Sequence, residues 1–159
     1  MSSHNSHLTA ISRKTLPRPT RWLMSYDPLL LLVKQKYLIM DYGCGKCELV
    51  NPSNWVNYDP YYCFADLSKS TGMFERIVCN YVLCVIPPEE RMYVLKDIQR
   101  LLKDSGMAYI SVRNDKPQWG WGVSKRKTYQ GRVQGLPLPL LYKCHGFRIY
   151  TLTKDTELV

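Results

Sequence analysis

Two glycines directly after a short apolar run constrain the fold of this chain most. Residues 37–42 are apolar except for Asp41, and Gly43 and Gly45 follow at once. A short apolar run of this kind is typical of a parallel strand, because parallel strands are covered on both faces. Glycine has no side chain, so the backbone of such a loop can approach a ligand closely. The pattern predicts a buried strand with a ligand-binding loop at its carboxyl end.

Further elements are expected on both sides of this strand. Residues 20–26 can form two helical turns, and residues 29–33 are apolar enough to be buried against a sheet. Residues 55–59 and 76–81 are short and strand-like, and the second segment extends towards Ile86. These segments predict at least two strands after the glycine loop.

The clearest helix follows two prolines. Pro87 and Pro88 end the preceding strand and begin the helix, where Glu89 and Glu90 complement the positive end of the helix dipole. Gly106 is expected to end it. The residues that recur on one face of this helix are Leu95, Ile98 and Leu102.

The order of strands and helices predicts an α/β, Rossmann-like fold with a mostly parallel sheet. Residues 107–112 and 147–152 supply two more strands, the last of which we expect to be antiparallel. The expected organisation is a flexible N-terminal arm (1–16), a single domain (17–153) and a C-terminal tail (154–159).

Two acids flank the glycine loop in the sequence. Asp59 follows Asp41 by eighteen positions, at the end of the next predicted strand. In nucleotide-binding α/β folds an acid roughly 20 residues on accepts hydrogen bonds from ribose hydroxyls, which is the role we expect for Asp59. A turn at Asp59-Pro60 is the alternative. Glu48 replaces the third glycine of the dinucleotide fingerprint, which disfavours a nicotinamide cofactor.

Positive charge is concentrated in two regions of a chain whose formal net charge is +9. Between Arg113 and Arg148 there are eight basic residues against one acid, Asp115. Arg13, Lys14, Arg18 and Arg21 form the second cluster. Such surfaces suit a polyanion, because phosphate contacts release counterions, so we expect nucleic acid as a possible partner. The alternative is a solvated surface that keeps the protein soluble.

One stretch of the basic region interleaves aromatic and basic residues, which suits stacking on bases beside phosphate contacts. We therefore expect Lys125, Arg126 and Lys127 to contact the substrate. The alternative is a loop whose tryptophans pack back on the domain. The stretch comprises Lys116, Trp119, Trp121, Lys125, Arg126, Lys127 and Tyr129.

The pattern Asp41-x-Gly43-x-Gly45 resembles motif I of class I S-adenosylmethionine-dependent methyltransferases. Residues 74–83, and residues 101–106 after the helix, resemble the corresponding parts of the same enzymes. Four further segments resemble methyltransferases of phages and of DNA phosphorothioation gene neighbourhoods, so that the likeness covers residues 7–152. These are His7-Leu8-Thr9-Ala10-Ile11-Ser12-Arg13, Arg18-Pro19, Tyr109-Ile110-Ser111-Val112-Arg113 and Thr128-Tyr129-Gln130.

The resemblance implies S-adenosylmethionine as cofactor. In motif I the acid organises the loop and lies near the amino-acid end of the cofactor, and Asp41 matches that acid. The residues expected at the cofactor are Asp41, Tyr42, Gly43, Gly45 and Asp59.

The acceptor side is predicted from topology, because side chains at the carboxyl ends of parallel strands face the ligand crevice. This nominates Asn80, Tyr81 and Arg113. Asn80 could orient an amino or hydroxyl nucleophile. Tyr81 could stack on a base or stabilise the sulfonium, or be part of the core. Arg13, in the arm, is a further substrate-binding candidate.

The chain departs from the usual methyltransferase pattern in several places. Cys47 stands for the third glycine, and Glu75 for an aspartate that often opens the next strand. Residues 61–73 are too short for the usual extra strand and helix, so we expect a compact version with a shortened middle. Asp66 is the local candidate for the acid that contacts the adenine of the cofactor in these enzymes. A solvent-facing loop position is the favoured interpretation of this residue. For His7, a candidate base, an exposed position is favoured.

Three alternatives stay open. A zinc site could use Cys44, Cys47, Cys63 and His145, but it lacks a second clean pair. A non-catalytic protein could bind cofactor or nucleic acid on the same fold. A small-molecule methyltransferase would show activity insensitive to salt.

The cysteines and apolar runs bear on the compartment. Six cysteines could form three bridges, but such frameworks belong to exported chains, so reduced thiols are expected. Residues 29–33 are too short to span a bilayer, and the N-terminus lacks a signal-peptide core. We expect a soluble protein of the cytoplasm, or of the host cytoplasm if a phage encodes it, with no membrane partner.

Overall fold

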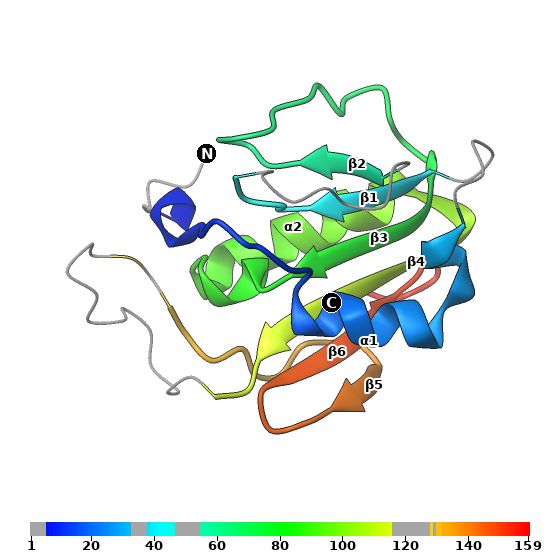
Figure 1. Cartoon of the computed structure of the whole chain (residues 1–159). Coiled ribbons are helices and arrows are strands. Elements are labelled where there is room, and N and C mark those ends of the chain that lie inside the picture. The colour runs from blue at the N-terminus through cyan, green and yellow to red at the C-terminus, as the bar shows by residue number, and fades with distance from the viewer. Residues whose placement is uncertain (1–5, 33–37, 47–54, 116–127, 129) are drawn as a thin grey trace.

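The computed structural model describes residues 6–32, 38–46, 55–115, 128 and 130–159. These residues form one six-stranded sheet with the strand order β2-β1-β3-β4-β6-β5 (Figure 1). β1, β2, β3 and β4 are parallel, and β6 and β5 are antiparallel to their neighbours. The strands are β1 (Ile39–Tyr42), β2 (Trp55–Tyr58), β3 (Phe74–Asn80), β4 (Leu102–Arg113), β5 (Leu140–Lys143) and β6 (Phe147–Leu152).

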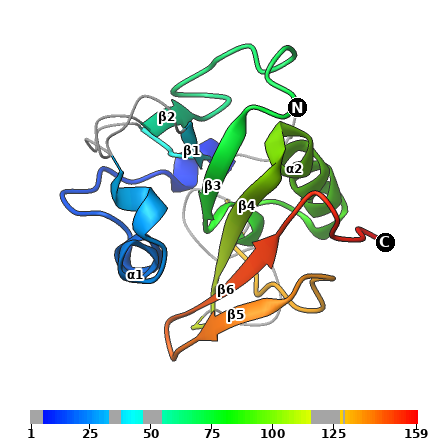
Figure 2. The same ribbon diagram turned by 90° about the vertical axis from the view of Figure 1, so that its right-hand side faces the viewer.

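Two α-helices cover opposite faces of the sheet (Figure 2). α1 (Arg18–Tyr26) begins after Pro17 and has Pro19 in its first turn. α2 (Pro88–Leu101) has Glu89 and Glu90 in its first turn, where they complement the helix dipole. Three short 3₁₀ helices complete the described elements, namely η1 (Ser6–Thr9), η2 (Pro28–Leu31) and η3 (Val82–Cys84).

The core has two parts because residues along each strand alternate between the faces of the sheet. Met40 and Ile77 belong to the cluster on the α2 side, with Leu95 and Ile98 of the helix. The cluster on the α1 side contains Leu23, Leu30, Ile39, Val78 and Ile149. Burial of both faces explains why the central strands are nearly continuous apolar runs.

The predicted α/β, mostly parallel sheet with an antiparallel C-terminal strand is confirmed. The middle is short, as expected. Residues 59–73, all of which the structure describes, contain no strand beyond an isolated bridge between Asp59 and Cys63.

Two details of the prediction are wrong. α2 ends at Leu101, so Leu102, which was expected on the helix face, begins β4, and Gly106 lies inside β4 instead of ending the helix. A Cβ on Gly106 would lie 2.8 Å from the Phe74 carbonyl oxygen, at a shift in the β3–β4 register, so this glycine serves a close backbone approach. The predicted extension of β3 towards Ile86 is also wrong. The strand stops at Asn80, and the short helix η3 begins at Val82.

The chain on either side of the domain also contributes contacts. In the segment predicted as a flexible arm, Ser6–Thr9 forms η1, which lies near the carboxyl ends of the parallel strands (Figure 1). In the tail, the Gln99 amide donates hydrogen bonds to the carbonyls of Thr153, Lys154 and Thr156. No helix in the described part of the chain is both long enough and apolar enough to cross a bilayer.

The expectation of reduced thiols holds for four of the cysteines that the structure describes and is wrong for one. Cys44, Cys79, Cys84 and Cys144 are not in disulfide bonds, whereas Cys63 is disulfide-bonded.

Candidate functional site

The parallel strands end beside a cleft of about 860 Å³. After β1 the chain adds β2 on one side of it and then crosses back to add β3 on the other side, so the order of the strands reverses between β1 and β3. Ligands of open α/β sheets bind at such a switch point, outside the carboxyl ends of the strands. Most of the predicted site residues line the cleft: Arg13, Asp41, Tyr42, Gly43, Gly45, Asp59, Asn80, Tyr81 and Arg113.

The glycine loop forms one wall of the cleft. Gly43 and Gly45 have φ angles of +77° and +68°, in the left-handed region that favours glycine. A Cβ on Gly43 would lie 2.3 Å from Cγ2 of Val82, so a side chain there would force Val82 to shift. The amides of Gly43 and Cys44 both donate to the Tyr58 carbonyl, which ties the loop to the end of β2.

Asp59 holds the other side of the same loop. Its Oδ2 accepts a hydrogen bond from the Gly45 amide at 3.1 Å. Its Oδ1 accepts from the amides of Tyr61 and Tyr62 at 2.9 and 3.1 Å. The alternative turn role is therefore present, in a residue that also lines the cleft. Its contact with a ribose stays a prediction.

Negative charge gathers at this end of the cleft. Burial raises the pKa of the Cys44 thiol to about 12, and the carboxylates of Asp41 and Asp59 add to this rise. Cys44 is therefore a neutral thiol near pH 7, not a thiolate. The two acids leave this end suited to a cationic ligand group.

Tyr42 contributes differently from its neighbours. Its side chain is buried on the α2 side, where its hydroxyl donates to Asp97 Oδ2 at 2.8 Å. Burial raises the pKa of Tyr42, and the Asp97 carboxylate raises it further. This tyrosine anchors the end of β1 to α2, at the edge of the cleft.

The side chain of Asn80 is engaged within the protein. Its Nδ2 donates to Thr20 Oγ1 at 2.7 Å, and its Oδ1 accepts from Ser111 Oγ at 2.8 Å. Asn80 thus joins α1 to β4 at the floor of the cleft. These bonds occupy one donor and one acceptor of the amide, and one N–H is left for a ligand.

Tyr81 has an unusual backbone. Its φ angle of 63° is in the left-handed region, and it is the non-glycine residue with positive φ in the described chain. Such a conformation costs about 1 to 3 kcal/mol and is often found at functional sites. The Arg13 guanidinium carbon lies 6.0 Å from the centre of the Tyr81 ring. The turn after β3 therefore presents this ring to the cleft.

The N-terminal segment forms the wall opposite the sheet. His7 stacks on Tyr61 with ring centroids 4.4 Å apart, and its carbonyl accepts a bond from the Tyr62 hydroxyl. His7 Nδ1 is buried and has no hydrogen-bond partner among the described residues. The prediction that His7 is exposed is therefore wrong, because its side chain is partly buried. Ala10 approaches Gly45, 3.4 Å from where a Cβ would lie.

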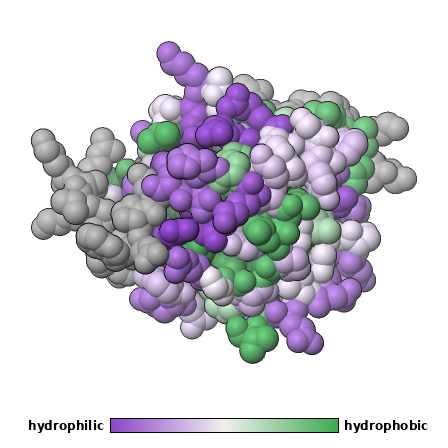
Figure 3. All heavy atoms as spheres, turned by 90° about the horizontal axis from the view of Figure 1, so that it is seen from below, coloured by the Kyte–Doolittle hydropathy of each residue, from purple (hydrophilic) through white to green (hydrophobic). Residues whose placement is uncertain are grey.

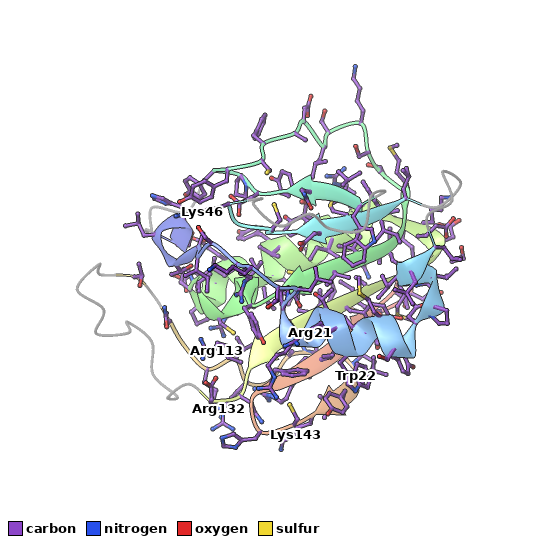
Figure 4. All side chains as sticks on the ribbon, in the orientation of Figure 1. Arg21, Trp22, Lys46, Arg113, Arg132 and Lys143 are labelled. Carbon is purple, nitrogen blue, oxygen red and sulfur yellow. The ribbon has the colours of Figure 1, made fainter. Side chains whose placement is uncertain are left out.

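Several cleft residues were not predicted as site residues, among them Arg18 and Val82. Arg18 was noted in a basic cluster and in a segment of the family resemblance, and Val82 only within the resembling segment 74–83, so neither was singled out as a site residue. Arg18 reaches over Gly146, where an added Cβ would lie 3.0 Å from Nη1. Figure 4 places Lys46 beyond the glycine loop and Arg113 at the end of β4, both on the side where the parallel strands end.

Several predicted residues lie outside the described part of the chain. These include Lys125, Arg126 and Lys127 of the basic stretch, and Cys47 of the proposed zinc site. Among the described residues, no group of three His, Cys, Asp or Glu side chains is placed to hold a metal ion. Asp66 is exposed and its Oδ1 accepts from the Ser68 amide, away from the cleft lining.

Solved structures share this fold. A 1,6-didemethyltoxoflavin-N1-methyltransferase from Burkholderia thailandensis, solved with 1,6-didemethyltoxoflavin and S-adenosylhomocysteine, matches with a TM-score of 0.57 and 14% identity, over 84% of this chain and 76% of that one. A protein from Pyrococcus horikoshii matches with a TM-score of 0.51 and 11% identity, over 86% and 91% of the two chains. At these identities the likeness establishes the Rossmann-like fold of methyltransferases. No protein-family model matches the sequence, and no similar curated protein is found.

Proposed function

We propose that this protein is an S-adenosylmethionine-dependent methyltransferase. The observation that carries the proposal is the glycine loop at the switch point of the sheet, where Gly43 and Gly45 open a cleft between Asp41 and Asp59. The motif Asp41-x-Gly43-x-Gly45 resembles motif I of class I methyltransferases, and the fold is the one that the Burkholderia enzyme has.

The residues at this loop fit the charge and size of the cofactor. S-adenosylmethionine carries a sulfonium and an ammonium group, and the acids Asp41 and Asp59 stand at the same end of the cleft. The missing side chain at Gly43 lets Val82 pack directly against the loop, and Gly43, Cys44 and Gly45 line the cleft. A cleft of about 860 Å³ is within the range of small-molecule sites. We assign Asp41 to the amino-acid end of the cofactor and Asp59 to the ribose.

When bound, the cofactor supplies a methyl group on a good leaving group, so the protein mainly has to align the acceptor and exclude water. Tyr81 offers a ring on which a planar acceptor can stack, and the remaining N–H of Asn80 can orient it. The segment from Ser6 to Arg18 lines one side of the cleft, where it limits the access of water. His7 also lines the cleft and is the candidate general base.

The acceptor we propose is nucleic acid. The formal net charge of +9 supports it, because a basic surface attracts phosphates. The resemblance to methyltransferases of phages and of DNA phosphorothioation neighbourhoods points the same way. Viewed from the side of α1, β5 and β6, hydrophilic side chains gather on the half of the surface towards the carboxyl ends of the parallel strands (Figure 3).

One observation favours a second candidate, a protein that binds the cofactor without catalysis. The Asn80 amide already bonds to Thr20 and Ser111, which leaves less of it for an acceptor. This candidate shares the cofactor site and differs in the absence of methyl transfer. Cofactor binding with no transfer to DNA or RNA would favour it.

Calorimetric titration with S-adenosylmethionine tests the shared part of both candidates. We expect saturable binding that Asp59→Asn weakens by about tenfold or more, because an amide nitrogen cannot accept the bond from Gly45. Asp66→Asn is the matched control, since Asp66 also accepts a backbone amide but lies outside the cleft. No binding at millimolar cofactor, or equal loss in both variants, would reject the proposed site.

A further inference from the structure

Three arginines from distant parts of the chain meet around Tyr81. Arg13 comes from the N-terminal segment, Arg18 from the start of α1 and Arg113 from the end of β4, and all three line the cleft. Burial raises the pKa of Tyr81. The positive charges of Arg113, Arg13 and Arg18 oppose this rise.

Aromatic rings hold two of these guanidinium groups. Arg13 lies over Tyr81, with 6.0 Å from Cζ to the ring centre, and Arg18 lies over Phe147 at 5.5 Å. A guanidinium that stacks on a ring keeps its N–H groups available for an anion. The two side chains are therefore positioned without using their donors on a carboxylate.

Within the described part of the chain, the positive charges of this group are not fully balanced. Arg113 makes a bidentate pair with Asp115, at 2.9 and 2.7 Å. No ion pair of the described residues includes Arg13 or Arg18. Even when Glu90, which also lines the cleft, is counted with Asp115, the three cations exceed the acids, and an anionic ligand group would neutralise this excess.

The cleft as a whole is therefore bipolar. Asp41 and Asp59 lie at the glycine loop, and the arginines lie at the Tyr81 end. The remaining acid of the lining, Glu90, comes from α2. If the cationic cofactor binds at the glycine loop, the acceptor binds at the Tyr81 end. The positive charge of the arginines at that end suits an anionic acceptor.

We propose that Arg13, Arg18 and Arg113 form a phosphate-binding subsite that positions the acceptor beside Tyr81. The proposal rests on the proposed function for the identity of the acceptor. The phosphate can belong to a nucleic acid strand or to a small phosphorylated molecule, since the recognition chemistry is the same.

The test is a titration of the protein with inorganic phosphate at constant ionic strength, with and without S-adenosylhomocysteine. We expect Arg13→Gln and Arg18→Gln each to weaken phosphate binding by about fivefold or more, because each removes charge-assisted hydrogen bonds. Arg21→Gln is the matched control. Arg21 lies on the same helix as Arg18 and carries the same charge, but it is exposed outside the cleft lining.

Equal losses in Arg21→Gln and the two cleft variants, or no saturable phosphate binding by the unmodified protein, would overturn the subsite. Arg18 packs on Phe147, so if Arg18→Gln fails to fold, Arg13→Gln alone decides, because Arg13 is exposed on the N-terminal segment.

A single-stranded DNA oligonucleotide, titrated in the same way, distinguishes the two sources of phosphate. A loss of affinity for both probes supports the subsite with a strand as its ligand, and a loss for inorganic phosphate alone supports it with a small phosphorylated acceptor. A loss for the oligonucleotide alone would overturn it, because the effect would then be diffuse. Absence of S-adenosylhomocysteine binding would reject the proposed function and leave the phosphate result standing.

Discussion

At the scale of single residues, Gly43 is the most constrained position of the cleft. A Cβ there would lie 2.3 Å from Val82 Cγ2, in a backbone with φ of +77°. Gly43→Ala should therefore lower the free energy of unfolding by about 1 to 2 kcal/mol and greatly weaken cofactor binding. Gly135→Ala is the control, since Gly135 has φ of +65° and open space around it. It should cost similar stability in urea unfolding and leave cofactor affinity unchanged, and equal losses of affinity would argue against the loop.

The residue scale also separates what the sequence could predict from what it could not. Asp41, Asp59 and Arg113 were expected at one edge because the ends of parallel strands meet there, and all three line the cleft. The bonds of Asn80 to Thr20 and Ser111 depend on the packing of α1 against the sheet, which no local pattern encodes. The left-handed backbone of Tyr81 is equally invisible, since tyrosine rarely adopts it.

At the scale of elements, one buried network attaches α1 and η2 to the sheet. Asp27, between the two helices, accepts bonds from Arg76 Nε and the Tyr109 hydroxyl, both at 2.6 Å. Burial alone would raise the pKa of Asp27, but the bonds from Tyr109 and Arg76 outweigh it and lower this pKa below its usual value. The network therefore holds a carboxylate in a largely apolar place.

Asp27→Asn should reduce the free energy of unfolding at pH 7 by about 3 kcal/mol, because Arg76 loses the charge it is buried against. A lowered native pKa means that the stabilisation is complete above the usual carboxyl pKa of about 4 and is lost as the pH falls through the lowered value. The difference between the two proteins in urea unfolding should therefore shrink below about pH 4. The exposed control Asp104→Asn should change little, and a difference that stays constant down to pH 2 would contradict this account.

The elements themselves were predictable where their pattern was local. The apolar run of β1 and the proline start of α2 are read directly from sequence. β5 was missed because its burial is irregular, with Leu140 exposed, and because a register shift separates Leu140 from Tyr142 in its pairing with β6. Gly106 was misassigned because a glycine after a helix resembles a C-cap. Here a glycine is needed because the Phe74 carbonyl of the neighbouring strand β3 approaches closely.

At the scale of the whole molecule, the sheet, α1 and the N-terminal segment together enclose a cleft with acids at one end and arginines at the other. The fold class followed from the order of strands and helices, because that order permits few topologies. The position of the N-terminal segment as a wall of the cleft could not be predicted from the sequence. Residues 6–18 carry no periodic pattern and are positioned by contacts such as the His7–Tyr61 stack.

The most direct measurement is a crystal structure of the protein with S-adenosylhomocysteine. The account predicts electron density for this ligand between the Gly43–Gly45 loop and Asp59, with its sulfur directed towards Tyr81 and its amino group near Asp41. Density elsewhere on the molecule, or an unliganded cleft in crystals grown at saturating ligand, would contradict it.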